Sequence, residues 1–547
     1  MKKLVIAMLL GVFAVVYGQP YEPVNIWHRC GTRYYEQFGC RIAGVGDQNG
    51  DGYEDFIIGQ PGFPGEMTWN VVGLYYGGDP PDTTLDVLFE RWADSVWCGE
   101  VANVGDVNGD GGIDIALSQT RSFIWNKVAI YYGGSAFDTI PDLILNEPSA
   151  EYSDLYGRDV EGLGDVNGDG FDDMAVHAPS YDHQRGKVWV YFGGSPMDTI
   201  ADWEKVGVSQ TVYFGNSIAG KGDLNGDGYD DFAVYEWTGY PSHAETNYYV
   251  FLGSSELDTI PDLVIYGEHY YPEIDLASSL AMICNLNGDT YSDLVISASG
   301  TANVVVFYGS PSMNTEIDLI LQGFETPLPG GGSGIIVSAT GDVNADGFDD
   351  ILASQPHSND YAGRILVYFG GPWMDGQPDI QYIGYGQPGH GYGRTLAECG
   401  DVNGDGVDDI IFGSWDPGIN TEGCVDIWAG DSTWVVNVPT ENPEPVPNLF
   451  HLYPPYPNPF NTQLTIPFEV LPGISNQARL KICNILGEEV IDLTNQVGRS
   501  DLSPTLSRKE LIWNGRNTQG LDCTSGIYFV ILQVGENREV QKAVLLR

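Results

Sequence analysis

The 547-residue sequence is short of positive charge: 24 Lys and Arg stand against 75 Asp and Glu, which gives a net charge of −51. So acidic a chain repels nucleic acid and anionic membrane surfaces and attracts cations. Beyond residues 4–16 no apolar run approaches the roughly 20 residues of a membrane-spanning helix. The composition therefore argues against nucleic-acid partners and predicts a mature protein without a transmembrane segment.

Catalytic and zinc-binding motifs are also missing. The sequence has no HExxH, P-loop, G-x-S-x-G or strand-linked GxGxxG motif, and the second glycine of GGGSG (330–334) is misplaced for a nucleophile elbow. The eight cysteines include no CxxC pair, which argues against a zinc site. We therefore predict that the protein is not an enzyme.

The first 18 residues have the features of a secretory signal peptide. Lys2 and Lys3 precede the apolar run, and Gly18 lies before a plausible cleavage point at Gln19. Export permits disulfides, and an even number of cysteines favours them. The pairs expected within single units of the chain are Cys30–Cys40, Cys399–Cys424 and Cys483–Cys523, with Cys98 and Cys284 as free, buried thiols.

The strongest positive signal is internal repetition. Seven similar segments begin 57 to 62 residues apart. They are GDQNGDGYEDFIIG (46–59), GDVNGDGGIDIALS (105–118), GDVNGDGFDDMAVH (164–177), GDLNGDGYDDFAVY (222–235), CNLNGDTYSDLVIS (284–297), GDVNADGFDDILAS (341–354) and GDVNGDGVDDIIFG (400–413). Such regular spacing indicates one structural unit repeated seven times.

Each unit contains four short runs rich in Val, Ile, Tyr and Phe that end at Gly or Pro, which indicates four antiparallel strands. Four strands in each of seven units predict an all-β protein with a seven-bladed β-propeller. The seventh unit lacks an obvious fourth strand. The N-terminal segment 23–28 is the favoured strand to close the ring, and 434–438 is the alternative.

The loop in each unit reads D-x-N-x-D-G-x-x-D, with oxygen-bearing side chains at positions 1, 3, 5 and 9 and glycine at position 6. Calcium takes six to eight oxygen ligands, and a tight loop can direct them at one centre. The predicted ligands are Asp47, Asn49, Asp51, Asp55; Asp106, Asn108, Asp110, Asp114; Asp165, Asn167, Asp169, Asp173; Asp223, Asn225, Asp227, Asp231; Asn287, Asp289, Asp293; Asp342, Asn344, Asp346, Asp350; and Asp401, Asn403, Asp405, Asp409.

Asp, Asn and Gly are also good turn formers, but turn chemistry does not require three carboxylates within nine residues. Without a cation, charges so close together would repel one another. We therefore expect up to seven calcium ions with a structural role. The fifth site is the weakest, because Asn285 replaces the aspartate at position 1 and Thr290 replaces the glycine at position 6.

The seven units resemble FG-GAP repeats, which build the N-terminal propeller of integrin alpha subunits and occur in many bacterial surface proteins. The resemblance covers roughly residues 31–431. It implies a seven-bladed propeller with calcium in the hairpin loops and, more weakly, adhesion or ligand binding. The departures are the fifth loop and the weak aromatic-Gly pair in the second, fifth and sixth units.

The end of the chain has a different character. After a Pro- and Glu-bearing linker come YPNPFN (456–461), a W-x-G-x-N segment (513–517) and SGIYF (525–529) within alternating apolar strands, which suggest a small immunoglobulin-like β-sandwich. These motifs resemble the C-terminal sorting domain of type IX secretion, which implies export to the exterior of a bacterial outer membrane. The expected divisions are 1–18 signal peptide, 19–438 propeller, 439–455 linker and 456–547 sorting domain.

The variable second turns of the units carry aromatic side chains and are expected on the face opposite the acidic loops. They are Trp69, Trp125, Tyr181, Trp237, Tyr240, Tyr361 and Trp415. Such rings suit stacking on sugars or anchoring a protein partner, although they also pack locally against loops. The sequence thus predicts a secreted or cell-surface protein that binds a glycan or protein ligand. The alternative is an extracellular polysaccharide-degrading enzyme built on a propeller.

Overall fold

The computed structural model describes residues 23–547 apart from a set of segments. The segments outside the description are 33–35, 61–70, 90–97, 120–125, 135–136, 149–153, 209–211, 238–245, 267–278, 299–302, 325–334, 357, 359–361, 373, 385–390, 415–421, 435–449, 453–454, 459, 471–477, 485–488, 495–508, 519–520 and 535–536. The chain divides into two compact units, Met1–Val438 and Pro439–Arg547.

Strands dominate both units. Over the described residues the single α-helix is the four-residue α1 (Tyr181–Gln184). No helix in that part of the chain has the length and hydropathy needed to cross a bilayer. The predicted all-β class is confirmed.

The first unit contains seven antiparallel four-stranded sheets among its described residues. In six of them the strands pair in chain order: β2 (Arg41–Gly46), β3 (Asp55–Gln60), β4 (Val71–Tyr75), β5 (Val87–Phe89); β6 (Cys98–Gly105), β7 (Asp114–Gln119), β8 (Lys127–Tyr131), β9 (Leu143–Asn146); β10 (Asp159–Gly164), β11 (Asp173–Ala178), β12 (Lys187–Tyr191), β13 (Trp203–Val206); β14 (Phe214–Gly222), β15 (Asp231–Trp237), β16 (Thr246–Phe251), β17 (Leu263–Tyr266); β18 (Leu280–Ile283), β19 (Asp293–Ala298), β20 (Asn303–Phe307), β21 (Leu319–Leu321); and β22 (Ile336–Ala339), β23 (Ile351–Ser354), β24 (Arg364–Tyr368), β25 (Ile380–Ile383). The seventh sheet contains β26 (Thr395–Glu398), β27 (Ile410–Ser414), β28 (Cys424–Ala429) and β1 (Val24–Cys30).

The middle strands are the most buried, because neighbouring sheets cover both of their faces. β12 is buried along its whole length, whereas the outer strand β13 is buried only at Trp203. Hydrophobic clusters join successive sheets, so that Ile130 of β8 and Val176 of β11 share one core. Continuous apolar runs such as KVWVY are typical of strands covered on both sides.

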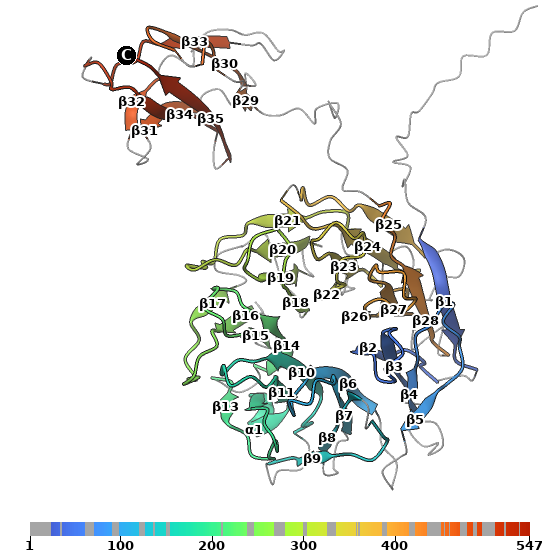
Figure 1. Cartoon of the computed structure of the whole chain (residues 1–547). Coiled ribbons are helices and arrows are strands. Elements are labelled where there is room, and N and C mark those ends of the chain that lie inside the picture. The colour runs from blue at the N-terminus through green and yellow to red at the C-terminus, as the bar shows by residue number, and fades with distance from the viewer. Residues whose placement is uncertain are drawn as a thin grey trace, which may run out of the picture. The chain divides into compact units, whose positions relative to one another are not determined.

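Figure 1 shows the sheets of the first unit arranged around a common centre, with the first paired strand of each sheet innermost. These inner strands contact one another in chain order, through β2, β6, β10, β14, β18, β22 and β26. β26 in turn contacts β2. The architecture is consistent with a β-propeller, in which four-stranded sheets surround an axis.

The N-terminal strand supplies the outer edge of the last of these sheets. β1 pairs antiparallel with β28, next to β27 and β26. This confirms the N-terminal segment, in preference to 434–438, as the fourth strand of the seventh sheet. Of that alternative, only Trp434 is described, and it stacks against Phe369 with 6.1 Å between the ring centroids.

A disulfide joins Cys30 to Cys424, which face each other across β1 and β28. The free cysteines among the described side chains are Cys40, Cys284, Cys399, Cys483 and Cys523. The three pairs expected within single units are therefore wrong, and Cys284 is exposed rather than buried. The bonded residues are 394 positions apart, so only the pairing of the two ends of the unit brings them together.

The second unit contains two sheets with one shared core. Their strands are β29 (Phe450–Leu452), β30 (Leu464–Val470) and β33 (Lys509–Trp513) in the first, and β32 (Glu489–Asp492), β31 (Ala478–Asn484), β34 (Gly526–Val534) and β35 (Asn537–Leu545) in the second. Leu464 and Trp513 of the first sheet and Leu480 and Val530 of the second belong to the same buried cluster.

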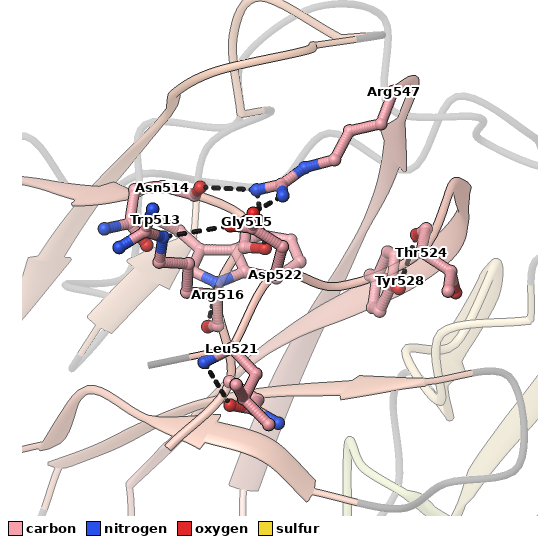
Figure 2. Close-up of polar contacts among 10 residues, drawn as sticks. Trp513, Asn514, Gly515, Arg516, Leu521, Asp522, Thr524, Tyr528 and Arg547 are labelled. Carbon is pink, nitrogen blue, oxygen red and sulfur yellow. Dashed lines mark hydrogen bonds and ion pairs between the residues drawn. The ribbon is translucent and has the colours of Figure 1, made fainter. Parts of the chain in front are cut away.

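The last residue of the chain is tied to this unit by polar contacts (Figure 2). Nη1 of Arg547 lies 2.7 Å from Oδ1 of Asp522, and Nε of Arg516 donates to the same oxygen at 3.0 Å. Nη2 of Arg547 donates to the backbone oxygens of Asn514 and Gly515 at 3.2 and 3.0 Å. The W-x-G-x-N segment is therefore a bend that holds the chain end in place.

Candidate functional site in the acidic hairpin loops

Each acidic loop joins the first and second strands of one sheet. The loop at 165–173, for example, connects β10 to β11, and its aspartate at position 9 begins the second strand. Positions are numbered 1 to 9 along the D-x-N-x-D-G-x-x-D pattern. Positions 1, 3 and 5 form the outer lip of a loop, and position 9 forms its buried base.

The aspartate at position 1 shapes the outer lip by accepting backbone N–H groups. Oδ1 of Asp165 accepts from Gly168 at 2.6 Å and from Asp169 at 3.0 Å, and Oδ2 accepts from Gly170 at 2.8 Å. The same three bonds recur at Asp47, Asp106, Asp223 and Asp401. Gly170 has a φ of +91°, a conformation that L side chains rarely adopt. The tight turn predicted around position 6 is therefore present.

The aspartate at position 9 faces inward. Asp173 is fully buried; its Oδ2 accepts the N–H of Val166 at 3.0 Å and its Oδ1 that of Gly193 at 2.8 Å. The bond to Val166 lies within the loop, and the bond to Gly193 reaches the end of β12. The base thus ties its loop to the third strand of the same sheet.

Burial raises the pKa of the base carboxyl. Loss of hydration is the largest cause, and it brings the pKa of Asp173 to about 8 despite the two backbone N–H donors. Burial likewise raises the pKa of Asp55, Asp114, Asp231, Asp293 and Asp409 to about 7 and that of Asp350 well above its usual range. A carboxyl at the base is therefore easily protonated, unless a nearby cation favours its charged form.

The residues of the outer lip fit a hard divalent cation. Asn167 and Asp169 are joined by two hydrogen bonds, of 2.8 and 3.0 Å, and the lip offers two carboxylates and an amide oxygen to solvent. Oxygen donors of this kind are what calcium prefers. Over the described residues, however, no single loop places three carboxylates within 4.8 Å of one another. The role of the aspartate at position 9 as a calcium ligand therefore stays a prediction.

The fifth loop departs from the others in the structure as it does in the sequence. Nδ2 of Asn285, at position 1, donates to the backbone oxygen of Gly347 in the next loop at 2.8 Å. An amide nitrogen cannot accept the backbone N–H groups that an aspartate binds at this position. Positions 3 and 5 keep their contact, since Asn287 Oδ1 accepts the N–H of Asp289 at 2.8 Å.

The sequence reasoning missed the residue at position 8, which joins neighbouring loops. Oδ2 of Asp172 accepts the N–H of Asp106 in the preceding loop at 2.7 Å, and Oδ2 of Asp230 accepts that of Asp165 at 2.8 Å. Asp349 and Asp408 make the equivalent bonds to Asn285 and Asp342. The sequence did contain a pattern that could have indicated this role, because position 8 is acidic in five of the seven loops. The exceptions are Ile113 and Ser292.

Position 7 makes a second contact between loops. Phe171 lies over Gly109, at position 4 of the preceding loop, so closely that an added Cβ would come within 2.5 Å of the ring. Tyr53 of the first loop covers Gly404 of the seventh in the same way. Where position 4 is Ala345, the next loop has the smaller Val407 at position 7. The contact is missing at Gly50, which has no atom of a neighbouring loop within 4 Å because the second loop has Gly112 at position 7. Position 7 therefore joins most of the loops to their neighbours, but not all of them.

Most of the predicted aromatic ligand face lies outside the described residues. This applies to Trp69, Trp125, Tyr240, Tyr361 and Trp415. The other two side chains are half-buried and pack locally. Tyr181 meets Trp189 edge-on at 5.8 Å, and Trp237 lies 5.2 Å from Tyr213 between ring centroids. A ligand-binding role for these residues stays a prediction.

Two family models match the chain. The FG-GAP repeat model matches residues 160–191 and 333–368, which contain the third and sixth loops. The model of the secretion system C-terminal sorting domain matches residues 455–546. The chain therefore carries FG-GAP repeats and a type IX sorting domain, and this domain indicates a protein that is secreted or held on the exterior of the outer membrane.

Integrin alpha subunits are homologues of part of the chain. Integrin alpha-IIb of Mus musculus is 28% identical over 271 residues, which cover 47% of this chain and 25% of that protein. Integrin alpha-6 of Gallus gallus is 36% identical over 162 residues, covering 28% of this chain and 14% of that protein. The matched part of this chain thus spans a quarter or less of the length of these relatives.

A weaker likeness connects the chain to a solved structure. PorZ, described as an essential bacterial surface component of the type IX secretion system of Porphyromonas gingivalis, aligns with 92% of this chain and 60% of its own. The TM-score is 0.36 and the sequence identity 12%. A likeness at this level carries no argument about function.

Proposed function

We propose that this protein is a secreted or cell-surface calcium-binding propeller that acts in adhesion or ligand binding and has no catalytic activity. The observation that carries the proposal is the recurring outer lip, in which two aspartates and an asparagine present oxygens around a preformed turn. The partial homology with integrin alpha subunits supports adhesion as the class of function. The sorting domain supports delivery by the type IX secretion machinery, after removal of a signal peptide at residues 1–18.

The proposed first unit is a closed ring of seven blades. Its support comes from contacts between the first and last sheets: the N–H of Glu54 donates to the backbone oxygen of Asp401 at 3.1 Å, and Gly78 donates to Val402 at 2.9 Å. For the second unit we propose an immunoglobulin-like sandwich, supported by its two sheets around one core.

Calcium in these loops would be held by the side-chain oxygens at positions 1, 3 and 5, with position 9 behind them. When bound, it supplies positive charge that offsets the repulsion between neighbouring carboxylates. Because each loop is hydrogen bonded to the next, neutralising one lip also stabilises the contact between two blades. The proposed role of calcium is therefore structural.

The test of the calcium proposal is metal analysis combined with thermal unfolding of the full-length protein. We expect up to seven calcium ions per chain and a fall in Tm when a chelator removes them, since a ligand bound only to the folded state stabilises it. Asp169→Ala should remove one ion and leave the other loops loaded. Protein that contains no calcium and melts at the same temperature with and without chelator would refute the proposal.

The ligand is proposed to be an extracellular glycan or protein. A glycan array, together with a pull-down of surface proteins, tests binding in the presence of calcium, and a reducing-sugar assay tests for the alternative of a polysaccharide-degrading enzyme. Trp237→Ala should weaken binding, whereas Tyr266→Ala on the outer strand β17 serves as a matched control. Release of sugar without retention of a ligand would favour the enzyme.

A further inference from the structure

Four side chains with metal-binding or metal-positioning chemistry lie together where β1 meets β28. Cys30 is opposite Cys424 in the strand register, and His28 is opposite Asp426. Residues two apart in a strand point to the same face, so the four side chains form one block on one side of the strand pair. This block, here called the clasp, lies at the outer edge of the seventh sheet and contains no residue of the acidic loops.

The distances within the clasp fit a metal site. Nε2 of His28 lies 3.3 Å from Sγ of Cys30, and the ligand atoms of His28, Cys30 and Cys424 all lie within 4.8 Å of one another. No other group of three such residues meets this limit in the described part of the chain. The His28 side chain is 55% exposed, so one side of the clasp is open to solvent.

Asp426 positions the imidazole. Its Oδ1 lies 2.7 Å from Nδ1 of His28 and also accepts a hydrogen bond from Nδ2 of Asn25. Its Oδ2 is buried, and no described residue donates a hydrogen bond to it. A carboxylate that binds one ring nitrogen of a histidine directs the other nitrogen toward a metal, and this pairing is usual behind zinc ligands. The arrangement leaves Nε2 facing the sulfur atoms.

We propose that reduction of the Cys30–Cys424 disulfide converts the clasp into a zinc-binding site. A dithiol supplies two electrons and two protons, the S–S bond becomes two thiols, and the dithiol closes to its own disulfide. On binding Zn²⁺ both thiols release their protons to water. Two thiolates and Nε2 of His28 then provide three ligands, and a water molecule takes the fourth position.

The chemistry of the donors separates this site from the acidic loops. Thiolate and imidazole select zinc, with Zn–S near 2.3 Å and Zn–N near 2.0 Å, whereas the loops offer the oxygens that calcium prefers. The lack of a CxxC motif does not bear on the site, because its ligands come from strands almost 400 positions apart. In either redox state the clasp links β1 to β28: through a covalent bond when oxidised, and through the metal when reduced.

Cobalt binding to the full-length protein tests the proposal. Protein reduced with a dithiol, freed of the reductant without oxygen and supplied with excess calcium, is titrated with Co²⁺. We expect one equivalent to produce a thiolate-to-cobalt charge-transfer absorption, and Zn²⁺ to displace it. Oxidised protein should give no such band, and cobalt in the acidic loops cannot produce one because those loops contain no thiolate at their predicted ligand positions.

Substitutions of single residues test which side chains bind the cobalt. His28→Asn, which keeps the disulfide during folding, should weaken cobalt binding by at least tenfold, and Asp426→Asn by 10- to 100-fold. Cys30→Ser should abolish the band, and Cys284→Ser, which removes an exposed cysteine elsewhere, should leave it unchanged. No band from reduced protein, a band that survives Cys30→Ser and His28→Asn, or a band lost with Cys284→Ser would each overturn the proposal.

Discussion

In the third loop Asp169 and Asp173 have the same side chain and lie in one nine-residue motif, yet they meet different surroundings. Asp169 belongs to the exposed lip, and its hydrogen bonds to described residues stay within its own loop. Asp173, by contrast, is buried and bonded to two backbone N–H groups. The lip is therefore suited to a cation, and the base is already part of the protein core. The residue type is the same at both positions, so the roles differ because the Asp173 side chain is buried and the Asp169 side chain is exposed.

The largest expected change in the free energy of unfolding comes from replacing the buried aspartate at position 9. Asp173→Ala removes two hydrogen bonds from buried N–H groups to a carboxylate, which should lower the free energy of unfolding by about 3 kcal/mol. Asp169→Ala, in chelator, should change it by less than about 1 kcal/mol. Urea unfolding of both variants without calcium measures the difference. Equal losses would show that lip and base are equivalent.

A smaller effect should follow from disturbing the contact between loops. Gly109→Ala places a Cβ against Phe171 at a φ of +77°, whereas Gly50→Ala meets the same strain at +75° in open space. The first substitution should cost about 1–3 kcal/mol more than the second, because overpacking adds to backbone strain. The difference in Tm between the two variants measures the contribution of the contact between Phe171 and Gly109. If both variants melt alike, the aromatic contact contributes nothing.

Glu161 on β10 is a half-buried acid, and no backbone N–H group of a described residue donates to it. Its dependence on pH therefore extends the comparison between lip and base. Burial, aided by the charge of Asp159, raises the pKa of Glu161 on β10 from its ordinary 4.5 to about 8. The folded state therefore holds a proton that the unfolded state has lost, so this contribution to stability disappears as pH rises from about 4.5 to about 8. Glu161→Gln should flatten that part of the profile, measured by urea unfolding at pH 5 and pH 8. An unchanged profile would contradict the assignment.

The smallest effect is expected from repairing the fifth loop. Asn285→Asp with Thr290→Gly restores the aspartate and glycine that the other loops use at positions 1 and 6. Metal analysis should then find one more calcium ion per chain, with little change in Tm. If the count stays the same, features outside the loop motif limit that site.

Much of the fold could be predicted from the sequence, because strands, turns and repeat spacing are local signals. The pairing of the N-terminal strand with the seventh sheet was predicted because the seventh unit lacks a fourth strand of its own. The Cys30–Cys424 bond was not found, since it depends on a register that exists only once β1 meets β28. The bond from Asp172 to Asp106 was missed for a similar reason, because the sequence does not give the distance between successive sheets.

The pairing of β1 with β28 makes the order of synthesis matter. The strand translated first has no pairing partner until β28 is made almost 400 residues later, so until then the backbone N–H and C=O groups along β1 stay unpaired. A chain that stops before β28 leaves this strand free to pair with another chain, even when its other sheets are folded. Premature termination should therefore promote aggregation through the N-terminal strand.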